Sequence, residues 1–217
     1  MNEEDKVIVI AALQAEIKSV AANLPADSRI ITRVTGIGSQ RMVAVATRLI
    51  EEHHPRRIIL IGFSGALLPE LAAGQIIHVS AVMNIAGQIV RLTEGEYDQR
   101  TTLLTVDHVV ATVEEKSTLR QNHRAAAIDM ESFALATLAR ERNIPLSIIR
   151  AISDTADFAL PAQIGEWVNE DGSPRVGAVM KALARKPSLL TTLLKLQSHT
   201  KTAARNLAAA VGDLLKE

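Results

Sequence analysis

The chain has 217 residues, 47% hydrophobic and 22% charged, a composition that favours a folded protein with a sizeable core over a disordered chain. Lys and Arg together number 24, as do Asp and Glu, so no global positive charge attracts nucleic acid. Cysteine is absent and aromatic residues make up only 2%, which excludes disulfides and cysteine-ligated zinc and leaves few side chains for stacking on single-stranded nucleic acid.

The first six residues are acidic and lack the basic region of a signal peptide. No uninterrupted apolar run approaches the ~20 residues that span a bilayer. We therefore expect a cytoplasmic protein.

Short apolar runs then alternate with segments of helical periodicity. Strands are predicted at residues 7–10, 29–34, 58–62, 75–82, 103–110 and 146–152, and helices from about residue 11 to before Pro25 and at 41–52, 114–121 and 130–142. Residues 63–71 and 91–100 are expected to be loops and 158–173 irregular, and the tail 174–217 is expected to be helical with a break at Lys186-Pro187. This alternation predicts one α/β domain over residues 1–217, with helices on both faces of the sheet.

Polar and acidic groups follow several of these strands. Glu16 follows the first strand, Gly36-Ile37-Gly38 the second, the segment Gly62 to Gly65 the third, and Ser153-Asp154 the last. Because ligands of open α/β sheets collect at the carboxyl ends of strands, we expect a site there.

Each motif also has a purely structural interpretation. Asp129 can cap the helix that follows it, and Ser153-Asp154 can form a turn. Two glycines, as in Gly36-Ile37-Gly38, usually mean only a tight turn, and the third glycine of a dinucleotide-binding loop is missing. His53-His54 before Pro55 indicates a solvated helix end, so we expect no metal site.

The order of five segments resembles that in the nucleoside phosphorylase and nucleosidase family. These segments are Glu16, Gly36-Ile37-Gly38, the loop from Gly62 to Pro69, Asp129-Met130-Glu131-Ser132 and the segment Arg150 to Asp157. The segments Leu103 to Val110, Phe158 to Pro161 and Ala182 to Pro187 resemble its hopanoid-associated branch. The resemblance implies an α/β/α sandwich with a mixed, mostly parallel central sheet. It also implies a cofactor-independent purine nucleosidase that releases adenine from an adenosyl compound, with adenosylhopane as the substrate suggested by the branch.

The resemblance assigns roles to individual residues. It makes Asp154 the general acid for the purine, Glu16 the group that activates water, Glu131 the ligand of the ribose hydroxyls and Met130 the floor beneath the sugar. It places Ser153 near the base and gives Arg150 a supporting contact to a carboxylate.

Two positions depart from the family pattern. Phe63 stands where nucleosidases have serine, with Ser64 and Gly65 following, which puts a serine contact to the nucleophile or sugar in doubt. Val109 replaces a commonly aromatic residue, so Val109 and Val110 are expected to hold the base by apolar contact and main-chain hydrogen bonds.

Hydrolysis is favoured over phosphorolysis, because Ala12 to Glu16 replaces the Gly-Asp-Pro segment of phosphorylases and a carboxylate there repels phosphate. A phosphate-dependent phosphorylase and a non-catalytic nucleoside-binding protein on the same fold stay open as alternatives.

The family implies a homodimer. The apolar run Leu189 to Leu196, with Lys186, Lys195 and Lys201 nearby, is expected to pack on the sheet or on a partner subunit, with contact to a membrane surface as the alternative.

Overall fold

The computed structural model describes residues 6–21, 23–92, 101–169 and 175–215. The strands within these ranges are β1 (Val7–Ala11), β2 (Ile30–Val34), β3 (Arg57–Ala66), β4 (Ile76–Asn84), β5 (Ile89–Arg91), β6 (Thr101–Thr105), β7 (Ala127–Asp129) and β8 (Leu146–Asp154). The helices are α1 (Gln14–Ala21), α2 (Ser39–His53), α3 (Val113–His123), α4 (Ser132–Glu141), the 3-10 turn η2 (Ile164–Trp167), α5 (Val176–Arg185) and α6 (Leu189–Leu214). The expected alternation of strands and helices is confirmed.

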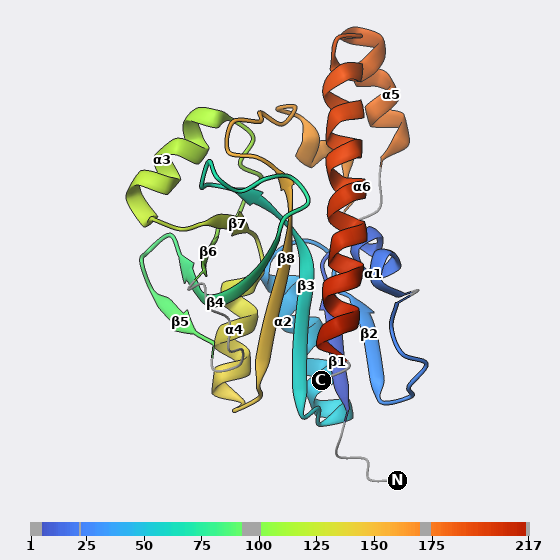
Figure 1. The fold of residues 1–217 in the computed structure, drawn as a ribbon, viewed down its shortest axis with the longest axis vertical. Helices are drawn as coiled ribbons and strands as arrows, with labels where there is room; N and C mark the ends of the chain where they lie inside the picture. Colours follow the sequence, from blue (N-terminus) through green and yellow to red (C-terminus); the bar gives the residue numbers. More distant parts are fainter. Residues whose placement is uncertain (1–5, 22, 93–100, 170–174, 216–217) are drawn as a thin grey trace.

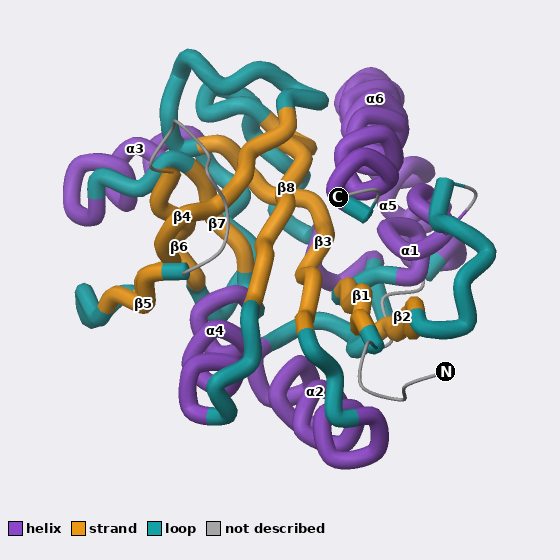
Figure 2. The backbone as a smooth tube through the Cα atoms, turned by 60° about the horizontal axis from the view of Figure 1, so that its bottom comes forward, coloured by secondary structure: helices purple, strands orange, loops and turns teal. Residues whose placement is uncertain are grey.

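The sheet is mixed and mostly parallel, as expected. Parallel pairs join β1 to β2 and β3, β3 to β8, and β6 to β4 and β7, whereas β3–β7, β4–β5 and β4–β8 are antiparallel. The pairings β3–β8–β4–β6–β7–β3 close on themselves, so one part of the sheet curls into a ring (Figure 2). This closure brings the ends of β3, β7 and β8 together.

Helices cover both faces of the sheet (Figure 1). Ile8 and Ile10 of β1 pack in a core with α2 and α4, while Val7 and Val9 pack in a second core with α1 and the end of α6. Burying such a side chain contributes roughly 1.5–3 kcal/mol, which explains why this strand is apolar at successive positions rather than at alternate ones.

The predicted loop at 63–71 is wrong at its start, because β3 continues to Ala66. Gly65 and Ala66 pair with Ile128 and Ala127 of β7. Residues 127–129, for which no strand was predicted, form β7 for the same reason. These segments are rich in small residues, and their strand state comes from pairing partners distant in the sequence rather than from local propensity.

Two other predicted boundaries also differ. The strand expected over 103–110 ends at Thr105 as β6, and residues 106–110 run irregularly past the site. The helix expected over 130–142 begins at Ser132. Most of the polar stretch 91–100 lies outside the described residues; Arg91 ends β5.

The predicted break in the helical tail at Lys186-Pro187 is confirmed by the separation of α5 from α6. The second half of α6 packs on the body of the protein, whereas α5 and the N-terminal turns of α6 project from it (Figure 1). Among the described residues, no helix combines the length and the apolar character that crossing a membrane requires.

Candidate active site

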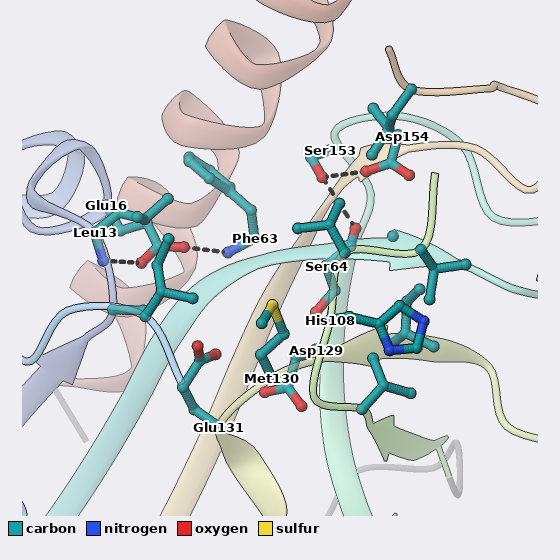
Figure 3. Close-up of a pocket in the computed structure, with 18 residues that line it drawn as sticks. Leu13, Glu16, Phe63, Ser64, His108, Asp129, Met130, Glu131, Ser153 and Asp154 are labelled. Carbon is teal, nitrogen blue, oxygen red and sulfur yellow. Dashed lines mark hydrogen bonds between the residues drawn. The ribbon is translucent and has the colours of Figure 1, made fainter. Parts of the chain in front are cut away.

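A pocket lies at the carboxyl ends of β1, β3, β6, β7 and β8 (Figure 3). Its walls are formed by Ala12, Leu13, Glu16, Ile37, Phe63, Ser64, Gly65, Val106, His108, Val109, Val110, Ile128, Asp129, Met130, Glu131, Ser153, Asp154 and Leu160. The pocket therefore contains every residue predicted for the site except Arg150, which lies behind the wall.

Glu16 enters the pocket from the first turn of α1. Its Oε2 accepts a hydrogen bond from the backbone N–H of Leu13, and its Oε1 accepts one from that of Phe63, both at 2.8 Å. The side chain is buried. Burial raises the pKa of Glu16 above its usual value, and the nearby positive charge of Arg150 opposes this rise.

Gly62 of β3 is required by the packing behind the pocket. A Cβ atom at this position would lie 2.1 Å from Nη1 of Arg150 and 2.8 Å from Oε1 of Glu16. Only glycine lets both charged side chains lie against the strand. The sequence motif around Gly62 therefore has a packing cause.

Arg150 is 1% exposed and anchors the second carboxylate segment. Its Nη2 pairs with Oδ2 of Asp129, donates to Oγ of Ser132 at 3.0 Å and lies 4.0 Å from Oε2 of Glu131. The expected carboxylate contact of Arg150 is thus made mainly to Asp129. Thr105 adds a hydrogen bond to Oδ1 of Asp129.

Asp129 also binds the first turn of α4, because its Oδ2 accepts from the backbone N–H of Ser132 at 3.0 Å. Asp129 thus binds the start of α4 from two residues before the N-cap position, which is Glu131, and the buried ion pair with Arg150 is added to this contact. Both groups in this pair are buried, so removing either partner would leave an uncompensated charge. Asp129 therefore holds the neighbouring Met130 and Glu131 in place.

Glu131 is 5% exposed, and its Oε1 accepts the backbone N–H of Gly38 at 2.9 Å. Ser39 adds a hydrogen bond to the carbonyl of Met130. Burial and the negative charge of Asp129 raise the pKa of Glu131 to about 7, against the opposing effect of Arg150. The loop at Gly36 to Gly38, with φ of 82° and 99° at its two glycines, thus donates a hydrogen bond to a carboxyl group of this chain.

Asp154 ends β8 and is held through both oxygens. Oγ of Ser153 lies 2.6 Å from Oδ1, and Nζ of Lys116 lies 2.6 Å from Oδ2. A Cβ atom on Gly65 would lie 2.9 Å from Oδ2, so glycine is needed here as well. The backbone of β3 therefore forms the surface on which Asp154 rests.

Sequence reasoning missed two charged residues of this region, His108 and Lys116. The ring nitrogens of His108 contact Asp107 at 2.8 Å and Glu115 at 2.7 Å, and these bonds raise the pKa of the imidazole. The adjacent Asp107 was the one sequence signal for His108. Lys116 had no such signal in the sequence, because a lysine one turn into a polar helix is expected to face solvent.

Ser64 contributes an unused polar atom to the pocket. The residue is 3% exposed, and its Oγ has no hydrogen-bond partner among the described residues. A buried hydroxyl without a partner is costly, and a ligand hydroxyl or amine can satisfy it. The serine expected at position 63 is thus replaced by a free hydroxyl one residue later.

The titratable groups lining the pocket are mostly acidic. Four carboxyl groups and one histidine face it, and neither Lys nor Arg occurs among the described residues that line it. Such a site stabilises positive charge developing on a bound molecule. Within the described residues, no group of three or more His, Asp or Glu side chains is arranged to hold a metal ion.

Comparison with known proteins fits this fold. The chain is 29% identical over 161 residues to the 5′-methylthioadenosine/S-adenosylhomocysteine nucleosidase of Staphylococcus saprophyticus, covering 60% of this chain and 71% of the relative. It is 24% identical over 221 residues to that of Bacillus cytotoxicus, covering 84% and 95%.

Two solved structures from Helicobacter pylori share the fold. Its 5′-methylthioadenosine/S-adenosylhomocysteine nucleosidase superposes with a TM-score of 0.73 at 14% identity, covering 98% of each chain. Its futalosine hydrolase superposes with a TM-score of 0.74 at 14% identity, covering 98% of this chain and 97% of the other. Residues 15–99 and 93–186 match the model of the phosphorylase superfamily, and the chain therefore belongs to that superfamily.

Proposed function

We propose that this protein is a purine nucleosidase that hydrolyses the N-glycosidic bond of an adenosyl compound and releases adenine. The observation that carries the proposal is the convergence of Glu16, Glu131 and Asp154, all buried, on one pocket. The nucleosidases among its relatives support it.

The reaction follows from the chemistry of the bond. As C1′–N9 breaks, its electron pair moves onto the base, and Asp154 donates a proton to N7. The sugar becomes cationic above Met130, and the carboxyl groups of the pocket that are ionised favour this charge. Glu16 takes a proton from the attacking water, whose oxygen bonds to C1′, while Glu131 accepts hydrogen bonds from the ribose hydroxyls. Val109 and Val110 contact the base.

Three features favour water over phosphate as the nucleophile. The N–H of Gly38 is taken by the carboxyl group of Glu131. Arg150, whose Nη2 lies 4.0 Å from Oε2 of Glu131, is paired with Asp129. In their ionised forms, Glu16 and Glu131 would repel a phosphate dianion entering the pocket.

We propose further that the 5′ substituent is large and apolar, with adenosylhopane as the candidate substrate. A groove lined by Ala15, Phe63, Leu193, Leu194, Leu196, Gln197, Ser198, Thr200, Lys201 and Ala204 adjoins the pocket. Phe63 lines both cavities, so a chain leaving the sugar can continue along α6. The exposed Val176 and Met180 on α5 support contact with the membrane that holds such a lipid. The homodimer stays a prediction, which light scattering tests.

The test incubates the protein with adenosine, methylthioadenosine, S-adenosylhomocysteine and adenosylhopane, each with and without phosphate, and measures free adenine. Adenine formed without phosphate supports hydrolysis, and a strict phosphate requirement moves the assignment to a phosphorylase. Asp154→Asn should lose the ~10²–10⁴-fold contribution typical of general acid catalysis. Asp157→Asn is the matched control, because that exposed carboxylate bonds Thr155 outside the pocket. Nucleoside binding in calorimetry without base release would favour the non-catalytic alternative.

A further inference from the structure

Lys116 is a fully buried cation that the reaction described above does not use. Its side chain is 0% exposed, and it is the one buried residue of α3. Thr112 fixes the start of this helix, because its hydroxyl accepts the backbone N–H of Glu115 at 3.1 Å. Lys116 follows in the next turn and points into the protein toward Asp154.

The hydrogen bonds of Lys116 define its charge state. Nζ lies 2.6 Å from Oδ2 of Asp154, 2.8 Å from the carbonyl of Thr155 and 3.0 Å from that of Phe158. These are three acceptors for the three N–H bonds of an ammonium group. A cation buried without such partners would be strongly unfavourable, so the site is built to hold a charged lysine.

The contact to Asp154 restricts which of its oxygens can act on a ligand. Oδ2 is covered by Lys116 and by the backbone at Gly65, whereas Oδ1 contacts Ser153, itself part of the pocket wall. Lys116 therefore restricts the rotation of the carboxyl group and leaves Oδ1 as the oxygen that the lysine does not cover.

We propose that Lys116 is a positioning residue for Asp154, an inference that rests on the proposed nucleosidase function. When Asp154 passes its proton to N7 and the C1′–N9 electron pair moves onto the base, the carboxylate left behind is stabilised by the ammonium group already in place. Such preorganised charge lowers the barrier without reorganisation during the reaction.

Other titratable groups lie in the same region. Glu16, His108, Asp129 and Glu131 line the pocket together with Asp154, while Asp157, which follows β8, lies outside it. Lys116 is in direct contact with Asp154, so its removal takes away the positive charge that favours the carboxylate form.

The test is a double-mutant cycle of Lys116→Met and Asp154→Asn. Lys116→Met should lower kcat at least about tenfold, less than the ~10²–10⁴-fold loss of Asp154→Asn, with little change in KM. It should also move the alkaline limb of the pH profile upward. In the Asp154→Asn background, Lys116→Met should lower kcat no further, because the carboxyl group that Lys116 positions is gone. Arg120→Met removes the same charge from an exposed position of α3 and should change none of these quantities.

Equal losses from Lys116→Met in both backgrounds, or an unmoved alkaline limb, would overturn the proposal and leave Lys116 a structural residue. If the wild-type protein releases no base from any nucleoside, the proposed function fails separately. The carboxyl ¹³C signal of Asp154, assigned with Asp154→Asn, then decides the question for Lys116. Its pH-dependent change must shift to higher pH in Lys116→Met, and an unchanged titration overturns the proposal.

Discussion

Phe63 donates its backbone N–H to Oε1 of Glu16 at 2.8 Å, so this contact does not depend on the Phe63 side chain. The ring instead packs with the core beneath α6. A residue that departs from the family pattern can therefore preserve the position of Glu16. The departure at Phe63 changes the shape of the pocket more than it changes the placement of the carboxylate.

Replacing Glu16 by glutamine should abolish most turnover, because an amide cannot take a proton from water. Glutamine also offers one acceptor oxygen to the two backbone donors of Leu13 and Phe63. In the wild-type protein, the raised pKa of Glu16 means that activity falls as pH drops through a value above 4.5. We expect the acid limb of kcat/KM there. Glu70→Gln, at an exposed position, is the control, and full activity of Glu16→Gln would remove Glu16 from the base role.

Glu131→Gln should separate stability from binding. The pKa of Glu131 is raised from 4.5 to about 7 in the folded protein, so the folded state holds this proton more tightly than the unfolded state does. The contribution of Glu131 to the free energy of unfolding is therefore fully present below pH 4.5. It is lost as pH rises through about 7, and its size is on the order of 3 kcal/mol. Urea unfolding should show Glu131→Gln to be more stable than wild type at pH 8 but not at pH 4.

The same variant should bind the nucleoside more weakly, because an amide is a poorer acceptor for ribose hydroxyls than a carboxylate is. In the wild type, KM should rise as pH falls through about 7. A KM that is independent of pH between 6 and 8 would contradict the role of Glu131 in holding the sugar.

Ser64→Ala should weaken substrate binding without harming the fold. Within the described part of the chain the hydroxyl has no partner, so its removal costs no hydrogen bond there. If it binds the substrate, the loss is about 0.5–1.5 kcal/mol, or roughly two- to tenfold in KM. Steady-state kinetics and the melting temperature check both parts, and an unchanged KM would show that the substrate leaves this hydroxyl unused.

Much of the fold was predictable because local periodicity and long-range packing agree. The run Val7 to Ile10 is apolar at every position and forms a strand buried on both faces. Residues 127–129 show where prediction from the sequence fails. They are a strand only because β3 and β6 supply partners, and no local pattern encodes a partner more than twenty residues away.

The residues of the site likewise divide into those that the sequence predicts and those that it does not. Glu16, Glu131 and Asp154 follow predicted strands or open a predicted helix, so the topology alone brings them near one edge of the sheet. Lys116 escaped prediction because its helix carries no apolar stripe to indicate which face is buried. Its burial depends on the position of Asp154, which is visible only once the chain is folded.

Gly65→Ala should damage the site more than it damages the fold. The new Cβ would lie 2.9 Å from Oδ2 of Asp154 and 3.3 Å from a side-chain carbon of Ile128, so the carboxylate must move. We expect a loss of about 1–3 kcal/mol in stability and a larger loss in kcat. Gly177→Ala in α5 meets no atom within 4 Å and should instead stabilise the protein by about 0.5–1 kcal/mol. Chemical denaturation and kinetics of both variants test this contrast.

The membrane contact considered for the run Leu189 to Leu196 stays a prediction; in α6, Leu190 and Leu194 of this run are 50% and 55% exposed. We propose that the contact extends to the neighbouring α5. No residue of this helix is buried, Val176 and Met180 are 65% and 61% exposed, and Lys181 and Arg185 supply positive charge nearby. An amphipathic helix of this kind binds anionic lipid through apolar insertion and electrostatic attraction.

Wild-type protein should therefore sediment with vesicles that contain anionic phospholipid, and Val176→Ser combined with Met180→Ser should not. Ile85→Ser with Ile89→Ser is the matched control, since these side chains are also 60% and 48% exposed but lie at the β4–β5 hairpin, a different element. Equal loss in both double variants would indicate nonspecific hydrophobic adsorption. Absence of the wild-type protein from the vesicle pellet would refute the membrane contact while leaving the pocket chemistry untouched, because α5 contributes no residue to the pocket.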